Sequence, residues 1–223
     1  MPTIYNIMNC FNYSSVYFNV AYSLITFGLI YGVIRDKRVG LATSAVLVFV
    51  LCFIPYALEY FPITMVKLTL IVFGSGLLFL ALNYDCFQPT ANQILTTVMR
   101  VNIGGLIVST HNIFIAIALL FAVATTPIFT VHNRTVKMES VLIPKDAWVV
   151  LSTAVLIAYY ISNPWFCHNI GLAVLAVLIP CFMHFFTDNF FESRALSLCV
   201  LIVFDIFNNS KKSINNLLDD SKY

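Results

Sequence analysis

The stretch that decides the fold runs from Val16 to Ile34 and reads VYFNVAYSLITFGLIYGVI. Its nineteen residues carry no formal charge, and it ends abruptly at the charged sequence Arg35–Arg38, RDKR. A helix that crosses a bilayer needs about 20 predominantly apolar residues, because the hydrocarbon core offers no water to free backbone groups. The stretch therefore predicts a membrane-spanning helix with basic residues at its end.

The composition of the whole chain points the same way. Of its 223 residues, 60% are hydrophobic and 10% are charged, whereas a soluble domain has about 25% charged residues. The twelve Lys and Arg residues and ten Asp and Glu residues leave a net charge of +2, which is too balanced for a nucleic-acid-binding surface. We therefore expect an all-α, polytopic transmembrane helical bundle surrounded by a lipid bilayer, with no nucleic-acid partner.

Further apolar runs predict about seven spans, within a range of six to eight. Runs at 41–58 and 68–82 would form the second and third spans. The run from Ala147 to Thr187 holds forty-one residues without a formal charge, interrupted near Ser162–Pro164. This length requires two spans. The last and shortest span would be 195–207.

The thirty-one residues from Val101 to Val131 also carry no formal charge, but they are harder to divide into spans. As one helix they would measure about 46 Å, which exceeds the ~30 Å hydrocarbon core. We expect one long, tilted helix from Ile94 to Phe129. A break at Ser109–Asn112, which would give two shorter segments, is the alternative.

We expect residues 1–208 to form a single transmembrane domain and residues 209–223 to form a polar C-terminal tail. The basic loop at 35–40 gives the strongest orientation signal and places that loop in the cytosol. Seven spans would put six Lys and Arg residues inside and five outside, whereas eight spans would put seven inside and four outside. Glycosylation acceptor patterns at Asn12 and Asn133 would share the outer side of a seven-span protein. The plasma membrane, an endomembrane and an organellar inner membrane all fit this sequence.

Ionisable side chains at membrane depth are the first candidates for function, because each costs about 2.5–3.5 kcal/mol on insertion scales unless it is paired or faces water. Arg100 opens the long uncharged stretch from Val101 to Val131, Asn102 follows it, and His111 lies about three helical turns further along. These three residues would line an anion or proton pathway. Alternatively, Arg100 extends to the lipid headgroups, and His111 marks a helix break or makes an interhelical hydrogen bond.

A second group of candidates lies near the C-terminus. His184 and Asp188 are four residues apart, so on a helix they would share a face and could couple a carboxylate to an imidazole. The alternative is a helix end that meets the membrane interface. Asp205 is surrounded by apolar residues, and a carboxylate there must be protonated, paired or exposed. It could serve a cation site or lie at a helix end close to solvent.

Several chemistries have no supporting motif in this sequence. The six cysteines show no C-x-x-C spacing, and no nucleotide-binding loop, H-E-x-x-H or G-x-S-x-G pattern occurs. We therefore expect no metal site, no cofactor and no catalytic residues of these kinds. A G-x-x-x-G pattern at Gly28 and Gly32, and the Gly74–Gly76 sequence, predict close helix packing.

The segment Val101–Val108, VNIGGLIV, resembles the glycine-containing third helix of a membrane subunit of respiratory complex I. It covers eight of the 223 residues, and Asn102 stands where that family usually has an aromatic residue. The resemblance implies a local π-bulge in this helix and a subunit role in a larger membrane assembly.

Three hypotheses of function are compatible with these patterns. The first is a small channel or transporter that moves protons or ions past Arg100, His111 and Asp205. The second is a structural or accessory subunit of a respiratory assembly or of a viral or organellar membrane, whose partners are copies of itself or other membrane subunits. The third is an intramembrane enzyme with a site at His184 and Asp188, which would need a further polar group within hydrogen-bonding distance.

Overall fold

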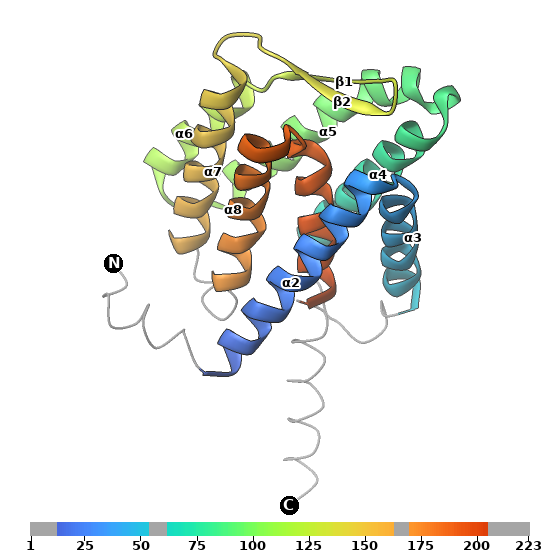
Figure 1. Ribbon diagram of the computed structural model, residues 1–223. Helices are drawn as coiled ribbons and strands as arrows, with labels where there is room; N and C mark the ends of the chain where they lie inside the picture. The colour runs from blue at the N-terminus through green and yellow to red at the C-terminus, as the bar shows by residue number, and fades with distance from the viewer. Residues whose placement is uncertain (1–12, 54–61, 163–169, 205–223) are drawn as a thin grey trace, which may run out of the picture.

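The backbone is almost wholly helical in residues 13–53, 62–162 and 170–204, which are the residues that the computed structural model describes (Figure 1). The predicted all-α class is confirmed. The elements are α2 (Tyr13–Arg35), α3 (Arg38–Phe53), α4 (Pro62–Asn83), the short 3-10 helix η1 (Asp85–Phe87), α5 (Gln88–Ser109), α6 (Ile113–Ala124), strands β1 (Ile128–His132) and β2 (Thr135–Glu139), α7 (Lys145–Ser162), α8 (Ile170–Thr187) and a last helix at 190–204.

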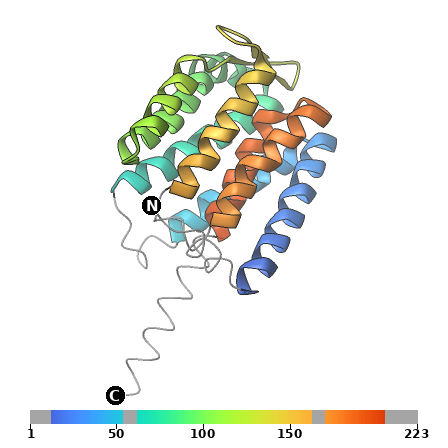
Figure 2. The same ribbon diagram turned by 90° about the vertical axis from the view of Figure 1, so that its left-hand side faces the viewer.

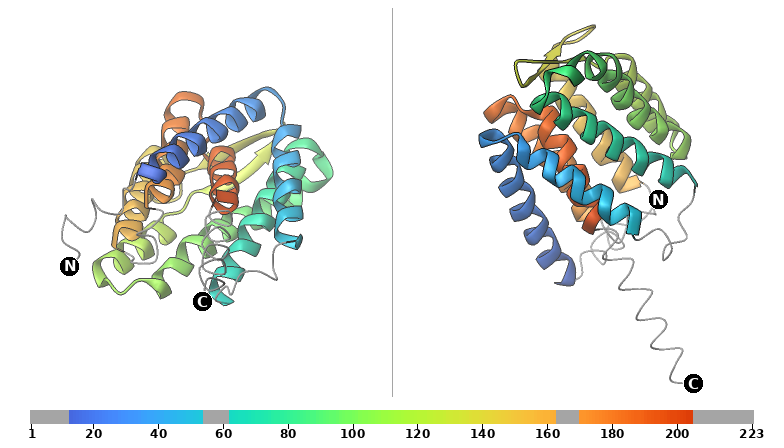
Figure 3. Two further views of the ribbon diagram at one scale, coloured as in Figure 1. Left: turned by 90° about the horizontal axis from the view of Figure 1, so that it is seen from below. Right: turned by 90° about the vertical axis from the view of Figure 1, so that its right-hand side faces the viewer.

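The helices run alternately up and down and pack side by side. Figure 2 shows α6, α7, α8 and α2 as neighbours in one layer, and each adjacent pair of these is in contact. Seen along the bundle, the 190–204 helix lies in the centre with the other helices around it (left view of Figure 3). Strands β1 and β2 lie at one end of the bundle, which we call the hairpin end. The loop after α2 and the loop after α8 lie at this end too.

The predicted long helix at 94–129 is wrong, and the alternative break is confirmed. Helix α5 ends at Ser109 and α6 begins at Ile113. Between them, Asn112 has an extended backbone, and its side chain accepts hydrogen bonds from the N–H groups of Phe114 and Ile115. This N-cap starts a new helix and cannot continue the preceding one. The chain reverses direction here, so the run at 101–131 contributes to two antiparallel helices where one was expected.

A β-hairpin, which was not predicted, connects α6 to α7. Its turn is made by Asn133 and Arg134, both with positive φ, as a tight two-residue hairpin turn requires. Strand β1 buries Phe129 and Val131 against the bundle. Their N–H groups donate to the side chains of Thr96 and Asn92 on α5, at 2.9 and 2.6 Å. The strand is therefore held to α5 by side chains that replace a third strand.

Other boundaries are close to those expected. Helix α2 contains the whole of the predicted first span, and the run at 147–187 forms two helices, α7 and α8, as predicted. The 190–204 helix begins before the predicted 195, and the predicted end of that span at 207 and the tail at 209–223 lie outside the described residues. Helix α5 is regular over Gln88–Ser109, so the π-bulge implied by the resemblance is not present.

Only two of the described helices are long and apolar enough to cross a bilayer by themselves, where about seven were expected. They are 16–35 and 170–187. Three other apolar helices are shorter, at 38–48, 69–83 and 113–124 within the described residues. Helices α5 and α7 place polar side chains in the interior, including those of Thr96, Ser152 and Thr153, which lowers their overall hydropathy.

Of the glycines predicted to allow close packing, Gly32 and Gly74 lie in tight contacts, and Gly40, which was not predicted, lies in a tighter one. A Cβ atom on Gly32 would lie 3.1 Å from a methyl carbon of Val39. A Cβ atom on Gly28 would meet nothing within 4 Å, whereas one on Gly40 would overlap the buried ring of Phe79. A Cβ atom on Gly74 would lie 2.8 Å from a methyl carbon of Val98. The contacts between α3 and α4 and between α4 and α5 therefore depend on glycine.

We expect Gly40→Ala to lower the free energy of unfolding by about 1–3 kcal/mol, because the added methyl group must displace a fully buried aromatic ring. Gly28→Ala is the matched control: it adds the same methyl group to a helix, in open space, and should be neutral or slightly stabilising. Thermal unfolding of the purified variants in detergent measures both. Equal effects of the two substitutions would contradict this packing.

Candidate functional site

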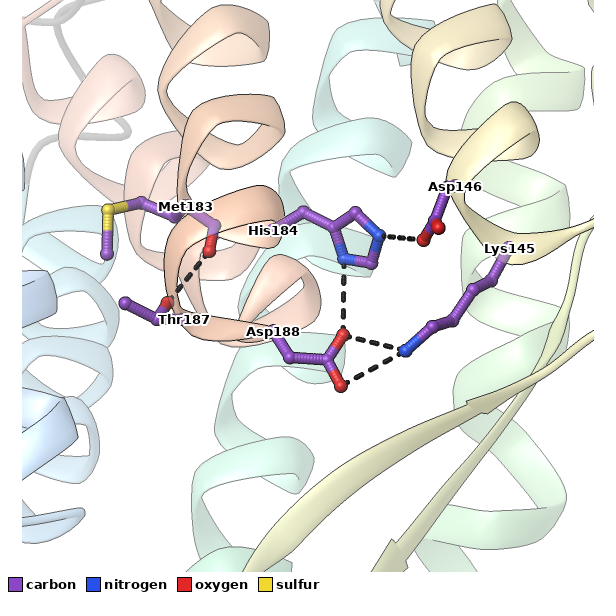
Figure 4. A network of polar contacts seen from close by, with 6 residues as sticks. All are labelled: Lys145, Asp146, Met183, His184, Thr187 and Asp188. Atoms are coloured by element: carbon purple, nitrogen blue, oxygen red, sulfur yellow. Dashed lines mark hydrogen bonds and ion pairs between the residues drawn. The ribbon is translucent and has the colours of Figure 1, made fainter.

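His184 and Asp188 meet two further charged residues at the hairpin end (Figure 4). The His184 Nε2 atom lies 2.8 Å from Oδ1 of Asp146, and its Nδ1 atom lies 3.5 Å from Oδ1 of Asp188. Lys145 Nζ lies 2.9 and 3.1 Å from the two Asp188 oxygens. The sequence analysis had singled out neither Lys145 nor Asp146, which come from the start of α7.

The ends of two helices place these four side chains together. Asp146 lies in the first turn of α7, where the helix dipole favours a carboxylate, and His184 lies in the last turn of α8, where it favours a cation. Asp188 has φ 53° and so takes the chain out of α8. The imidazole is buried, but the side chains of Asp146 and Asp188 are 61% and 68% exposed. The cluster therefore opens to the surface of the hairpin end.

This cluster places an imidazole between two carboxylates, and among the described residues no hydroxyl or thiol group is hydrogen-bonded to that imidazole. The hydroxyl group of the nearby Thr187 donates to the backbone oxygen of Met183 at 2.8 Å (Figure 4). A hydrolytic site needs a nucleophile or an activated water within hydrogen-bonding distance of its base. The geometry therefore joins α7 to α8 and favours a structural role.

A second polar group surrounds a cavity in the centre of the bundle. The cavity has a volume of about 140 Å³ and lies between α4, α5, α7 and the 190–204 helix. Its polar lining residues are Asn102, Ser152, Tyr160 and Arg194; the rest of its lining is apolar. A smaller cavity of about 40 Å³ also has Asn102 and Arg194 in its wall. Asn102 was among the predicted site residues, and Arg194 was not.

Arg194 is the most unusual of these residues, because its charge is buried without an ionic partner. It is 6% exposed, and its Nη1 atom donates to the backbone oxygen of Ala176 at 2.7 Å. No carboxylate of the described residues forms an ion pair with it. Glu192 is only two positions away but lies 3.5 Å from Lys37 Nζ. Positions two apart point to nearly opposite sides of a helix, at about 200°.

Pro180 explains why a backbone oxygen is available to Arg194. Proline has no N–H group, so the carbonyl oxygen of Ala176, four residues earlier in α8, loses its usual helical donor. The oxygen accepts instead from Arg194 at 2.7 Å and from the Ser197 hydroxyl at 3.0 Å. Ser197 Oγ also lies 2.6 Å from the hydroxyl of Tyr22 on α2. One proline thus connects α8, the 190–204 helix and α2 through polar contacts.

The remaining predicted residues do not join this cavity. Arg100 is half-buried, with Nη2 at 3.5 Å from the Thr126 backbone oxygen, so it extends toward the end of α6. Its Nε atom is buried without a hydrogen-bond partner in the described part of the chain. His111 is exposed in the loop between α5 and α6, at the end of the bundle opposite the hairpin. Asp205 lies outside the described residues.

The sequence gives no signal that Arg194 is buried, because other charged residues precede it closely. Arg194 follows Asp188 and Glu192, and such a sequence is typical of a helix end at the interface. Glu192 and Arg194 have different partners, Lys37 and the Ala176 oxygen, and these partners come from other parts of the chain that only the folded structure brings close. Within the described residues, no three His, Cys, Asp or Glu side chains are grouped so that they could hold a metal ion.

No protein-family model, curated protein or solved structure matches this chain. Its function is therefore argued from its own residues.

We expect Ser197→Ala to lower the free energy of unfolding by about 1–1.5 kcal/mol, because it removes a fully buried hydroxyl that contacts Tyr22 and Ala176. Ser23→Ala is the control, since the Ser23 hydroxyl bonds only to the carbonyl of Asn19 in its own helix; its effect should stay within about 0.5 kcal/mol. Denaturation monitored by circular dichroism measures both. A Ser197→Ala variant as stable as the natural chain would contradict the proposed role of this contact.

Proposed function

We propose that this chain is a multi-pass integral membrane protein that transports ions or protons. The distribution of side chains across the helices supports the membrane environment. On α2, for example, Leu24 is 69% exposed, whereas Tyr22 and Thr26 are fully buried. Large apolar side chains are also exposed along α6 and α8. The exposed ones on these two helices are Ile113, Phe114, Ile117, Leu120, Phe121, Phe182, Phe185 and Phe186.

Apolar exteriors and polar interiors suit lipid rather than water as the surrounding medium. A water-soluble bundle exposes polar faces, and contiguous apolar patches of more than a few hundred Å² are rare on soluble monomers. Thirteen polar or charged residues are buried in the described part of this chain. In a bilayer these groups must find partners within the bundle, and the contacts of Tyr22, Ser197 and Arg194 are of this kind.

The short α6 fits a bilayer only together with the strand that follows it. Its twelve residues measure about 18 Å, less than the hydrocarbon thickness. Irregular backbone at membrane depth is tolerated where it is buried in protein. Strand β1 meets this condition, because Phe129 and Val131 are buried and bond through their N–H groups to α5.

We propose eight spans with the hairpin end in the cytosol. The alternating helices place the loop after α2 and the hairpin at the same end, so the basic residues of these two connections would share one side of the membrane. They are Arg35, Lys37, Arg38, Arg134, Lys137 and Lys145. Lys and Arg residues in short loops mark the cytosolic side. Asn133 in the hairpin and Asn12 before α2 then lie on opposite sides, so glycosylation of both, which suits seven spans, is not expected.

The central cavity is the observation that carries a transport function. Charged side chains within spans are rare, and they mark substrate or ion pathways when they face a cavity. Arg194 and Asn102 both line the central cavity and the smaller cavity described above. A structural or accessory subunit, whose apolar faces contact copies of itself or other membrane subunits, is the alternative that the exposed apolar side chains also fit. An enzyme is a weaker proposal, because among the described residues no hydroxyl or thiol side chain is hydrogen-bonded to His184.

The eight-span arrangement predicts that the loop after α5 and the hairpin lie on opposite sides of the membrane. In a chain whose six cysteines are replaced by alanine, we expect His111→Cys and Thr135→Cys to react with a membrane-impermeant maleimide from opposite sides of sealed vesicles. Both positions are exposed. Labelling of both from the same side would indicate an even number of crossings between them and contradict this arrangement.

The transport proposal predicts that vesicles containing the protein dissipate an imposed pH or chloride gradient faster than protein-free vesicles. We expect Arg194→Gln to reduce this rate at least fivefold, because it removes the buried charge at the cavity. Arg38→Gln, at an exposed arginine outside the cavity, and His111→Ala should leave the rate unchanged. If the natural chain dissipates no gradient faster than empty vesicles do, the transport proposal fails and the subunit alternative is favoured.

A further inference from the structure

We infer that the cavity beside Arg194 binds a small monocarboxylate whose apolar body is about the size of benzene. The inference rests on the proposed function in one respect: it takes the bound monocarboxylate to be the species that the protein transports. The binding site itself is a separate property, argued from the charge, size and lining of the cavity.

The positive charge of Arg194 at the cavity favours an anion as the ligand. Arg194 carries five N–H donors in a planar fork, and the structure assigns one of its nitrogens to the Ala176 oxygen. No described carboxylate forms an ion pair with this guanidinium. A buried charge is costly unless it is paired. An anion in the cavity would supply the partner, and a guanidinium fork matches the two oxygens of a carboxylate.

The other residues that line the cavity indicate that the rest of the ligand is apolar. Its other walls are mainly apolar, among them Ile103, Leu106, Trp148 and Leu156. The volume of about 140 Å³ is close to that of an apolar cavity of ~150 Å³ that binds benzene in another protein. A phosphate or a nucleotide would need many more donors than this wall offers. A single carboxylate on a compact apolar body would pair with Arg194 and fill the apolar remainder of the cavity.

Asn102 is the second residue that we assign to the carboxylate. It lies on α5 in the wall of both cavities, together with Arg194 from the 190–204 helix. Its amide group has two donors. The Ser152 hydroxyl, by contrast, donates to the Val149 oxygen at 3.1 Å and is available mainly as an acceptor. Arg194 and Asn102 therefore supply donors from two different helices.

Binding of benzoate to the full chain in detergent tests this inference. Benzamide is the matched probe, because it has nearly the same shape without the charge. We expect saturable benzoate binding by calorimetry and at least tenfold weaker binding of benzamide. This comparison uses the natural chain, so it holds even if a variant fails to fold. Benzamide binding as tight as that of benzoate, or no binding of benzoate, would overturn the inference.

Two variants then locate the site. We expect Arg194→Gln to weaken benzoate binding at least tenfold and Asn102→Leu to weaken it several-fold, while Arg38→Gln has no effect. Circular dichroism and gel filtration confirm that each variant is folded. Unchanged affinity in folded Arg194→Gln would overturn the inference. Displacement of benzoate by an equal concentration of chloride would also overturn the inference, because the apolar part of the cavity would then contribute nothing to the affinity for benzoate.

The binding and transport measurements fail independently. Benzoate binding that depends on Arg194, together with vesicles that dissipate no gradient, would leave the monocarboxylate site in place and remove the transport function. Gradient dissipation by the natural chain, together with no saturable binding of benzoate, would leave the transport function and overturn the site.

Discussion

The unpaired carbonyl oxygen that Pro180 leaves on Ala176 is the constraint on which the centre of this bundle depends. A helix interrupted by proline has a free oxygen that must be satisfied from outside the helix when water is excluded. Ser197 and Arg194 provide the donors, and Ser197 extends the contact to Tyr22. The 190–204 helix lies in the centre of the bundle in Figure 3, where it can supply these donors to the Ala176 oxygen as well as make apolar contacts.

The sequence predicts a helix correctly where the length of an uncharged, apolar run is enough to define it. The run at 16–34 and the two helices within 147–187 required only an uncharged length and an interruption. The division of the run at 101–131 depends instead on one side chain, Asn112, which caps a helix in a position that hydropathy does not distinguish. Strand β1 was missed because the partners of its N–H groups are side chains on α5, distant in the sequence.

The candidate site was only partly predictable, because pairing of charges is a property of tertiary structure. His184 and Asp188 were found from their spacing, but Lys145 and Asp146, which complete their cluster, come from the start of α7. Asn102 was selected for its position in an apolar run. Arg194 differs from the other charges in having no ionic partner among the described residues, and that difference cannot be read from a sequence in which Glu192 is its near neighbour.

The contact between Arg194 and Ala176 allows an anion to bind without disturbing the packing of the bundle. Only one guanidinium nitrogen is assigned to the carbonyl oxygen, so the other donors of the fork can turn toward the cavity while that bond persists. The Ser197 hydroxyl also donates to this oxygen at 3.0 Å, and it keeps the oxygen satisfied if the arginine shifts toward a ligand. The packing of the bundle and the proposed ligand can therefore both use Arg194 without competing for the same donor.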